Sequence, residues 1–132
     1  MEKSQKEKIN LKNILIILSV VIGVILLFTF FDYLIHLLKE EYSVPGYYFR
    51  NKIIFGVIWG FLTLLILFKW KPKIWIKSIV FSTIISILLQ ARYLYEGYSL
   101  DFVIEFLFIH FGILFLISYA TFKLINKKIN IF

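Results

Sequence analysis

The sequence predicts an all-α integral membrane protein, a bundle of four transmembrane helices arranged as two helical hairpins. Of its 132 residues, 61% are hydrophobic and only 17% are charged, whereas soluble domains have roughly 45–50% apolar and about 25% charged residues. The apolar residues also gather into four runs that are long enough to cross a bilayer core of about 30 Å. A chain of this composition has too few polar residues to cover the surface of a soluble domain, and it is far more apolar than a disordered chain.

The four runs predict spans of about 14–38, 48–69, 74–95 and 101–125, within a transmembrane domain of residues 14–125. Residues 1–13 form a basic tail before this domain, and residues 126–132 form a short tail after it. The first run ends in bulky rather than small residues, which favours an uncleaved helix over a signal peptide. Pro45-Gly46 suits a type II turn, Pro72 stops helix continuation, and residues 96–99 predict a tight connection.

The charges predict the orientation. Eleven of the 15 basic residues fall on the side shared by the two termini and the loop near Pro72. With two acidic residues, that side carries +9, while four basic and six acidic residues give the other side −2; together they make the net charge of +7. The positive-inside rule therefore places both termini in the cytoplasm of a multi-pass cell-membrane protein. The expected partner is the lipid bilayer, with a homo-oligomer or a larger membrane complex left open, and no nucleic acid.

Several kinds of chemistry are disfavoured. The chain has no cysteine, which excludes thiolate metal sites, Fe–S clusters and cysteine nucleophiles. No serine is paired with a histidine at a readable spacing, and no glycine-rich phosphate loop follows a strand. We therefore expect no enzyme, no catalytic residue and no cofactor.

Small and polar residues indicate how the helices pack, because helices in lipid associate through close approach and polar contacts. The second span contains Gly56-x-x-x-Gly60, and the third carries a stripe at intervals of four residues. This stripe consists of Ser78, Ser82, Ser86 and Gln90. It has two interpretations, a packing face with hydrogen bonds between helices or the lining of a wet path for an ion or solute.

Five ionisable residues inside the spans are the candidate ion or proton site: Asp32, His36, Arg92, Glu105 and His110. At a rise of about 1.5 Å per residue, Arg92 and Glu105 each lie about 10 Å outside the midplane, so we expect them to pair. Asp32 lies at a similar level, with His36 one turn further on the same face. His110 lies only about 3 Å from the midplane. Ionisable groups at such depths are functional candidates.

The favoured function is a small transport or permeation protein, whose outward-facing polar vestibule leads toward His110. One alternative is a non-catalytic assembly, immunity or scaffold subunit of a membrane complex. Another is a membrane-embedded metal-binding protein, in which Glu105 joins Asp32 and His36. That spacing is generic, so we assign no metal ion. A haem held by His36 and His110 is excluded by a depth difference of about 15 Å.

Overall fold

The computed structural model describes residues 10–129. Within this range the chain forms four long helices, one short 3-10 helix and no strand. The elements are α2 (Leu11–His36), η1 (Glu40–Tyr42), α3 (Tyr47–Trp70), α4 (Ile74–Tyr95) and α5 (Leu100–Ile129). Each of the four long helices is long and apolar enough to cross a membrane. The prediction of an all-helical chain with four helices of spanning length is thus confirmed for the described residues. Residues 1–9 and 130–132 of the expected tails lie outside them.

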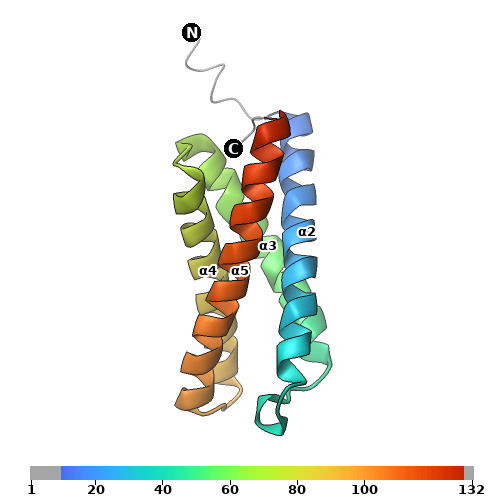
Figure 1. Ribbon diagram of the computed structural model, residues 1–132, viewed down its shortest axis with the longest axis vertical. Helices are drawn as coiled ribbons and strands as arrows, with labels where there is room; N and C mark the ends of the chain where they lie inside the picture. Colours follow the sequence, from blue (N-terminus) through green and yellow to red (C-terminus); the bar gives the residue numbers. More distant parts are fainter. Residues whose placement is uncertain (1–9, 130–132) are drawn as a thin grey trace.

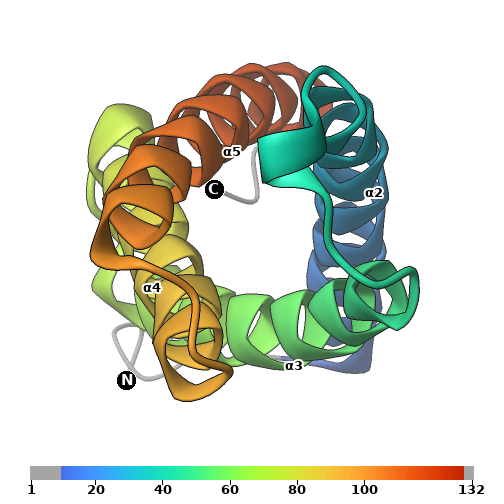
Figure 2. The ribbon, with the colours of Figure 1, turned by 90° about the horizontal axis from the view of Figure 1, so that it is seen from below.

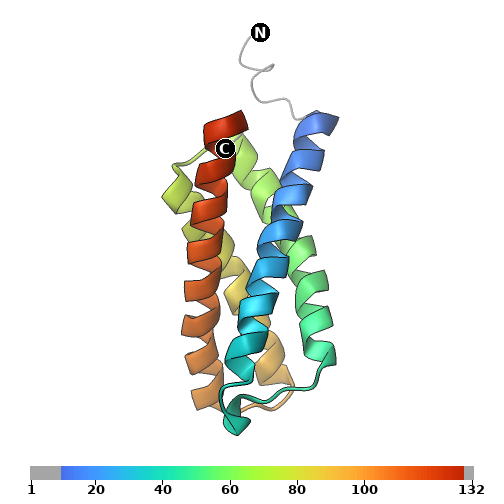
Figure 3. The ribbon, with the colours of Figure 1, turned by 45° about the vertical axis from the view of Figure 1, so that its right-hand side comes forward.

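The helices run antiparallel in two hairpins, α2 with α3 and α4 with α5 (Figure 1). Seen along the bundle, they follow one another around a ring, so that α5 closes against α2 (Figure 2). The start of α2 and the end of α5 lie at one end of the bundle. The opposite end carries η1 and the turn between α4 and α5, and we call it the η1 end (Figure 3).

The helix ends follow local backbone chemistry. Asn10 caps α2, because its side-chain oxygen accepts a hydrogen bond from the Asn13 N–H at 2.8 Å. Lys71 adopts a left-handed conformation with φ 56° and ends α3 just before Pro72. Gly97, with φ 92°, makes the tight turn between α4 and α5.

One expected turn type is wrong, and two helices end at residues other than the limits of the predicted spans. Pro45-Gly46 is not a type II turn, because Gly46 has φ −59° and ψ −31° and caps the start of α3 in the right-handed region. The first helix ends at His36 rather than near residue 38, and α5 continues to Ile129 rather than ending near 125. In α5 the helical backbone runs on through the polar residues that follow its last apolar run.

The buried apolar residues form two clusters. The larger one fills the bundle with side chains such as Val21, Ile25 and Phe81, and the smaller one is aromatic and includes Tyr93 and Phe106. The outward faces carry exposed large apolar side chains, which are spread along all the long helices that the structure describes. Such faces suit lipid tails rather than water.

The glycine pair packs within the bundle. A Cβ atom on Gly56 would lie 2.9 Å from Ile25 Cδ1, and one on Gly60 would lie 2.9 Å from Phe81 Cε1. These glycines therefore let α3 approach α2 and α4 closely. The contact that they make is between helices of the same chain.

Candidate functional site

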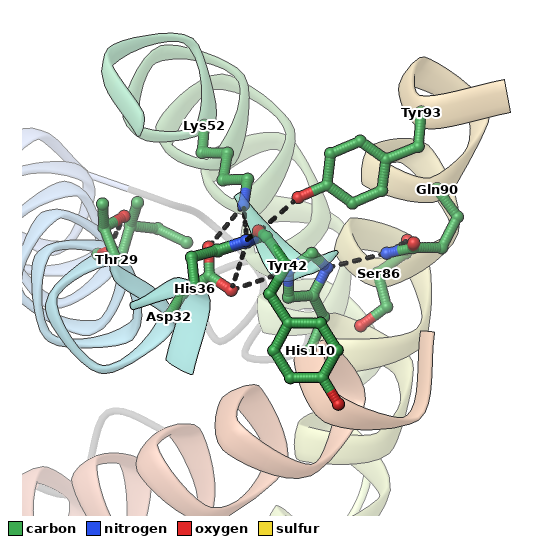
Figure 4. A network of polar contacts seen from close by, with 10 residues as sticks. Thr29, Asp32, His36, Tyr42, Lys52, Ser86, Gln90, Tyr93 and His110 are labelled. Carbon is green, nitrogen blue, oxygen red and sulfur yellow. Dashed lines mark hydrogen bonds and ion pairs between the residues drawn. The ribbon is translucent and has the colours of Figure 1, made fainter. Parts of the chain in front are cut away.

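A buried polar cluster surrounds Asp32, and Figure 4 shows its side chains. It lies in the half of the bundle nearer the η1 end, because Asp32 is one turn from the end of α2 and His36 contacts Tyr42 of η1. The Asp32 carboxylate forms an ion pair with Lys52 from α3. It also accepts a hydrogen bond from His110 Nε2 on α5 at 2.9 Å and lies 3.4 Å from His36 Nε2 on its own helix. Asp32 and His110 are 0% exposed, and His36 and Lys52 are 4% exposed. Side chains from three helices thus meet at one carboxylate.

Helical periodicity explains why these residues meet. Asp32 follows Ile25 and Phe28 on the buried face of α2, and His36 lies one turn beyond it. His110 likewise follows Phe106 on the buried face of α5. The buried faces of α2 and α5, which carry apolar residues along most of their length, therefore carry polar residues near Asp32.

The hydrogen bonds fix the proton positions on both histidines. His36 Nδ1 contacts the backbone carbonyl of Tyr42, which can only accept, so Nδ1 carries the proton. Its Nε2 lone pair then accepts from Lys52 Nζ at 3.2 Å and from the Tyr93 hydroxyl at 3.3 Å. His36 is therefore a neutral acceptor pointing into the cluster.

His110 has the opposite tautomer. The Gln90 amide nitrogen donates to the Ser86 carbonyl at 3.2 Å and also to His110 Nδ1 at 2.7 Å. Nδ1 is thus an acceptor, and the proton lies on Nε2, which donates to Asp32. The cluster then holds one negative charge on Asp32, one positive charge on Lys52 and two neutral imidazoles.

Aromatic rings enclose this cluster and separate it from water. The His36 ring stacks on Phe106, with ring centroids 4.4 Å apart, and Phe49 meets the same His36 ring edge-on at 5.4 Å. Lys52 Nζ lies 5.1 Å from the Phe49 centroid and 5.2 Å from that of Tyr93, distances typical of cation–π contacts. The ion pair therefore lies in surroundings of low polarity, where its attraction is strong.

Arg92 and Glu105 do not join the cluster, and the expected pair between them is wrong. Arg92 Nε donates to Glu96 at 3.1 Å, whereas the Glu105 carboxylate accepts from the Tyr42 hydroxyl at 2.6 Å. Helical rise gives the level of each residue along its helix, but it does not give the direction in which the side chain points around that helix. Arg92 turns toward α3, while Glu105 turns toward η1 on the surface.

The expected separation of the two histidines is also wrong, because the rings of His36 and His110 lie 6.5 Å apart between centroids. Side chains on a helix lean toward its N-terminus. On the antiparallel helices α2 and α5 this lean brings His36 and His110 toward each other. Depth along the helices therefore does not prevent the two imidazoles from binding the same ligand.

The sequence interpretation missed Lys52, Tyr93 and Tyr42. Lys52 is one of the four basic residues on the outer side of the predicted topology, although it lies one turn before Gly56 on the same buried face of α3. In the same way, Tyr93 continues the buried face that carries Gln90. Extending each polar or small-residue face by one turn finds both residues, but no local signal identifies the Tyr42 carbonyl.

The serine stripe is buried, with Ser78, Ser82 and Ser86 each 0% exposed. Their hydroxyls have no hydrogen-bond partner in the described part of the chain, and neither has Gln90 Oε1. They extend from the cluster along α4 toward the other end of the bundle. The stripe thus offers unused hydrogen-bonding groups along one line of the interior.

A pocket of about 120 Å³ adjoins the cluster between α3 and α4. Its polar lining includes Lys52, Asn51 and Arg92, and its apolar lining includes the exposed side chains of Phe55 and Trp59. Lys52 therefore contacts both the cluster and the pocket.

Comparisons with known proteins provide no family for this chain. No family model matches it, and no curated protein or solved structure matches it. Its function must therefore be argued from the geometry of the cluster.

Proposed function

We propose that the chain is a multi-pass protein of the cell membrane, with both termini in the cytoplasm, which transports a small cation. It acts without enzymatic chemistry, and the cation binds at the cluster around Asp32. The bilayer is its immediate partner. The observation that carries this proposal is the burial of Asp32, Lys52, His36 and His110 in contact with one another.

Burial of ionisable groups at this depth is expensive, which argues for a role beyond holding helices together. A buried ion pair often gives no more stability than well-packed apolar residues of the same size. Here a carboxylate, an ammonium group and two imidazoles occupy one site. Intramembrane groups of this kind mark ion pathways and sites in many membrane proteins.

The surroundings of the cluster supply two routes for an ion. At the η1 end, Tyr42 covers His36 and packs against Phe106, with ring centroids 5.0 Å apart. Toward the other end, the hydroxyls of Ser86, Ser82 and Ser78 follow one another along α4. Transport then requires η1 to open and the hydroxyls to line the way.

Flux into proteoliposomes tests this proposal. Vesicles that contain the purified chain are given inward gradients of H⁺, Na⁺, K⁺ and Zn²⁺ in turn, and uptake is followed with a trapped indicator for each ion. We expect uptake of at least one of them by the wild type and its loss in Asp32→Asn. Asp101→Asn is the matched control, because it makes the same substitution at an exposed carboxylate at the start of α5, outside the cluster. Wild-type uptake no faster than that of Asp32→Asn for every ion would overturn the proposal.

A second candidate is a non-catalytic subunit of a homo-oligomer or of a larger membrane complex. It is favoured by the small-residue face Ser19-x-x-x-Gly23 on α2, where Gly23 has no atom within 4 Å of an added Cβ. Substitution of Gly23 by Leu should then release a co-purifying partner or a second copy. Unchanged size of the purified species after this substitution would count against it.

A further inference from the structure

We propose that Asp32, His36 and His110 bind a divalent transition-metal ion, for which the Lys52 ammonium competes. This inference names the class of cation for the proposed transport, but the binding site itself does not depend on transport. Imidazole nitrogens with a carboxylate oxygen favour ions such as Zn²⁺, Co²⁺ or Ni²⁺ over Ca²⁺ and Mg²⁺, which prefer oxygen ligands.

The ligand atoms are close enough to share one ion. One nitrogen of each histidine and one Asp32 oxygen all lie within 4.8 Å of one another. Zn²⁺ binds such atoms at about 2.0–2.2 Å, so the set encloses an ion after small side-chain movements. The Tyr93 hydroxyl, 3.3 Å from His36 Nε2, lies beside the same place.

The second shell suits a metal site. Histidine ligands typically donate their other ring N–H to a carbonyl or carboxylate. His36 already does so, since its Nδ1 donates to the Tyr42 carbonyl and leaves the unprotonated Nε2 facing the cluster, where an ion can bind it once Lys52 is displaced.

His110 reaches the same state by a change of tautomer. To bind through Nε2 it must carry its proton on Nδ1. A flip of the Gln90 amide exchanges Nε2, which now contacts His110 Nδ1, for Oε1, which can accept that proton. That oxygen has no partner among the described residues. This buried acceptor lies on the residue that contacts His110, so Gln90 can hold His110 in the tautomer that binds a metal ion.

Without a metal ion, the Lys52 ammonium balances the negative charge of Asp32. Its Nζ contacts Asp32 Oδ2 and His36 Nε2, two of the three proposed ligands. An entering ion therefore has to displace the ammonium group. The adjoining pocket of about 120 Å³, which Lys52 also lines, provides space for its side chain.

Titration of the purified full-length chain with Co²⁺ in detergent tests the site. We expect one Co²⁺ per chain, with visible absorption from a site of nitrogen and oxygen ligands. His36→Gln and His110→Gln should each weaken binding about tenfold or more. Lys52→Gln removes a competing charge and should strengthen binding about tenfold or more. Misfolding can weaken Co²⁺ binding but cannot strengthen it. Lys52→Gln therefore tests the site even if the histidine variants are unstable.

Asp101→Asn, at an exposed carboxylate outside the cluster, is the matched control and should bind Co²⁺ like the wild type. Equal binding by the wild type, His110→Gln and Lys52→Gln would overturn the metal site. Co²⁺ binding without flux of any ion would keep the site and overturn the transport proposal. Flux of another cation without Co²⁺ binding would keep the transport proposal and overturn the metal site.

Discussion

Asp32 and His110 are 78 positions apart in the sequence, yet His110 Nε2 donates to the Asp32 carboxylate at 2.9 Å, and both side chains are fully buried. This bond joins α2 to α5, the helices that close the ring of the bundle (Figure 2). Lys52 of α3 forms an ion pair with the same carboxylate, so α3 is also held at this point. The polar cluster is therefore both the candidate site and a junction of the fold.

Removal of Asp32 alone should destabilise the bundle more than removal of the whole ion pair. Asp32→Leu leaves the Lys52 charge buried without its counter-charge, which costs about 3–5 kcal/mol. Asp32→Leu combined with Lys52→Met removes both charges and should recover most of this loss. Reversible unfolding in mixed micelles measures both free energies. A double variant as unstable as the single one would contradict the pairing.

Gly60 should be less tolerant of a side chain than Gly23. An added Cβ on Gly60 meets the Phe81 ring at 2.9 Å and Val21 at 3.1 Å, whereas Gly23 has open space. We expect Gly60→Ala to lower the free energy of unfolding by about 1–3 kcal/mol. Gly23→Ala should leave it unchanged or raise it. Thermal melting in detergent compares the two, and equal melting temperatures would show that the close approach is unimportant.

Ser82→Ala distinguishes the two interpretations of the serine stripe. The Ser82 hydroxyl is buried without a partner in the described chain, so its removal should raise the free energy of unfolding by about 1 kcal/mol or leave it unchanged. If the stripe lines the transport route, the same variant should also slow cation flux severalfold. A stable variant with wild-type flux would assign the stripe to packing alone.

The contact between Tyr42 and Glu105 should respond to alkaline pH. The hydrogen bond to the Glu105 carboxylate raises the pKa of the exposed Tyr42 phenol above its ordinary value of about 10. A pKa raised in the folded state means that the contact is present below pH 10 and is lost as pH rises through the raised pKa. The tyrosinate absorbance assigned to Tyr42, obtained by subtracting the titration of Tyr42→Phe, should move to lower pH in Glu105→Gln. An unmoved titration would show that the bond does not form in solution.

Much of this arrangement could be predicted from local patterns. Apolar run length determined the long helices within a few residues, because a span must be about 20 residues long whatever it packs against. The i,i+4 spacing placed Asp32 and His36 on one face of α2, since helical geometry alone requires it. The position of His110 in the middle of a predicted span made it a candidate, because burying an ionisable group in an apolar helix is costly.

Only the tertiary structure decided which of these residues meet. Arg92 and Glu105 share a level yet turn to different neighbours, and Lys52 enters the cluster from a helix where it looked like a surface charge. A single sequence gives the position of a residue along its own helix, but the rotation and tilt of each helix come from packing against the others. Asp32 and His110 meet because α2 and α5 are antiparallel neighbours. Each side chain leans toward the N-terminus of its own helix, and at this level that direction brings the two side chains together.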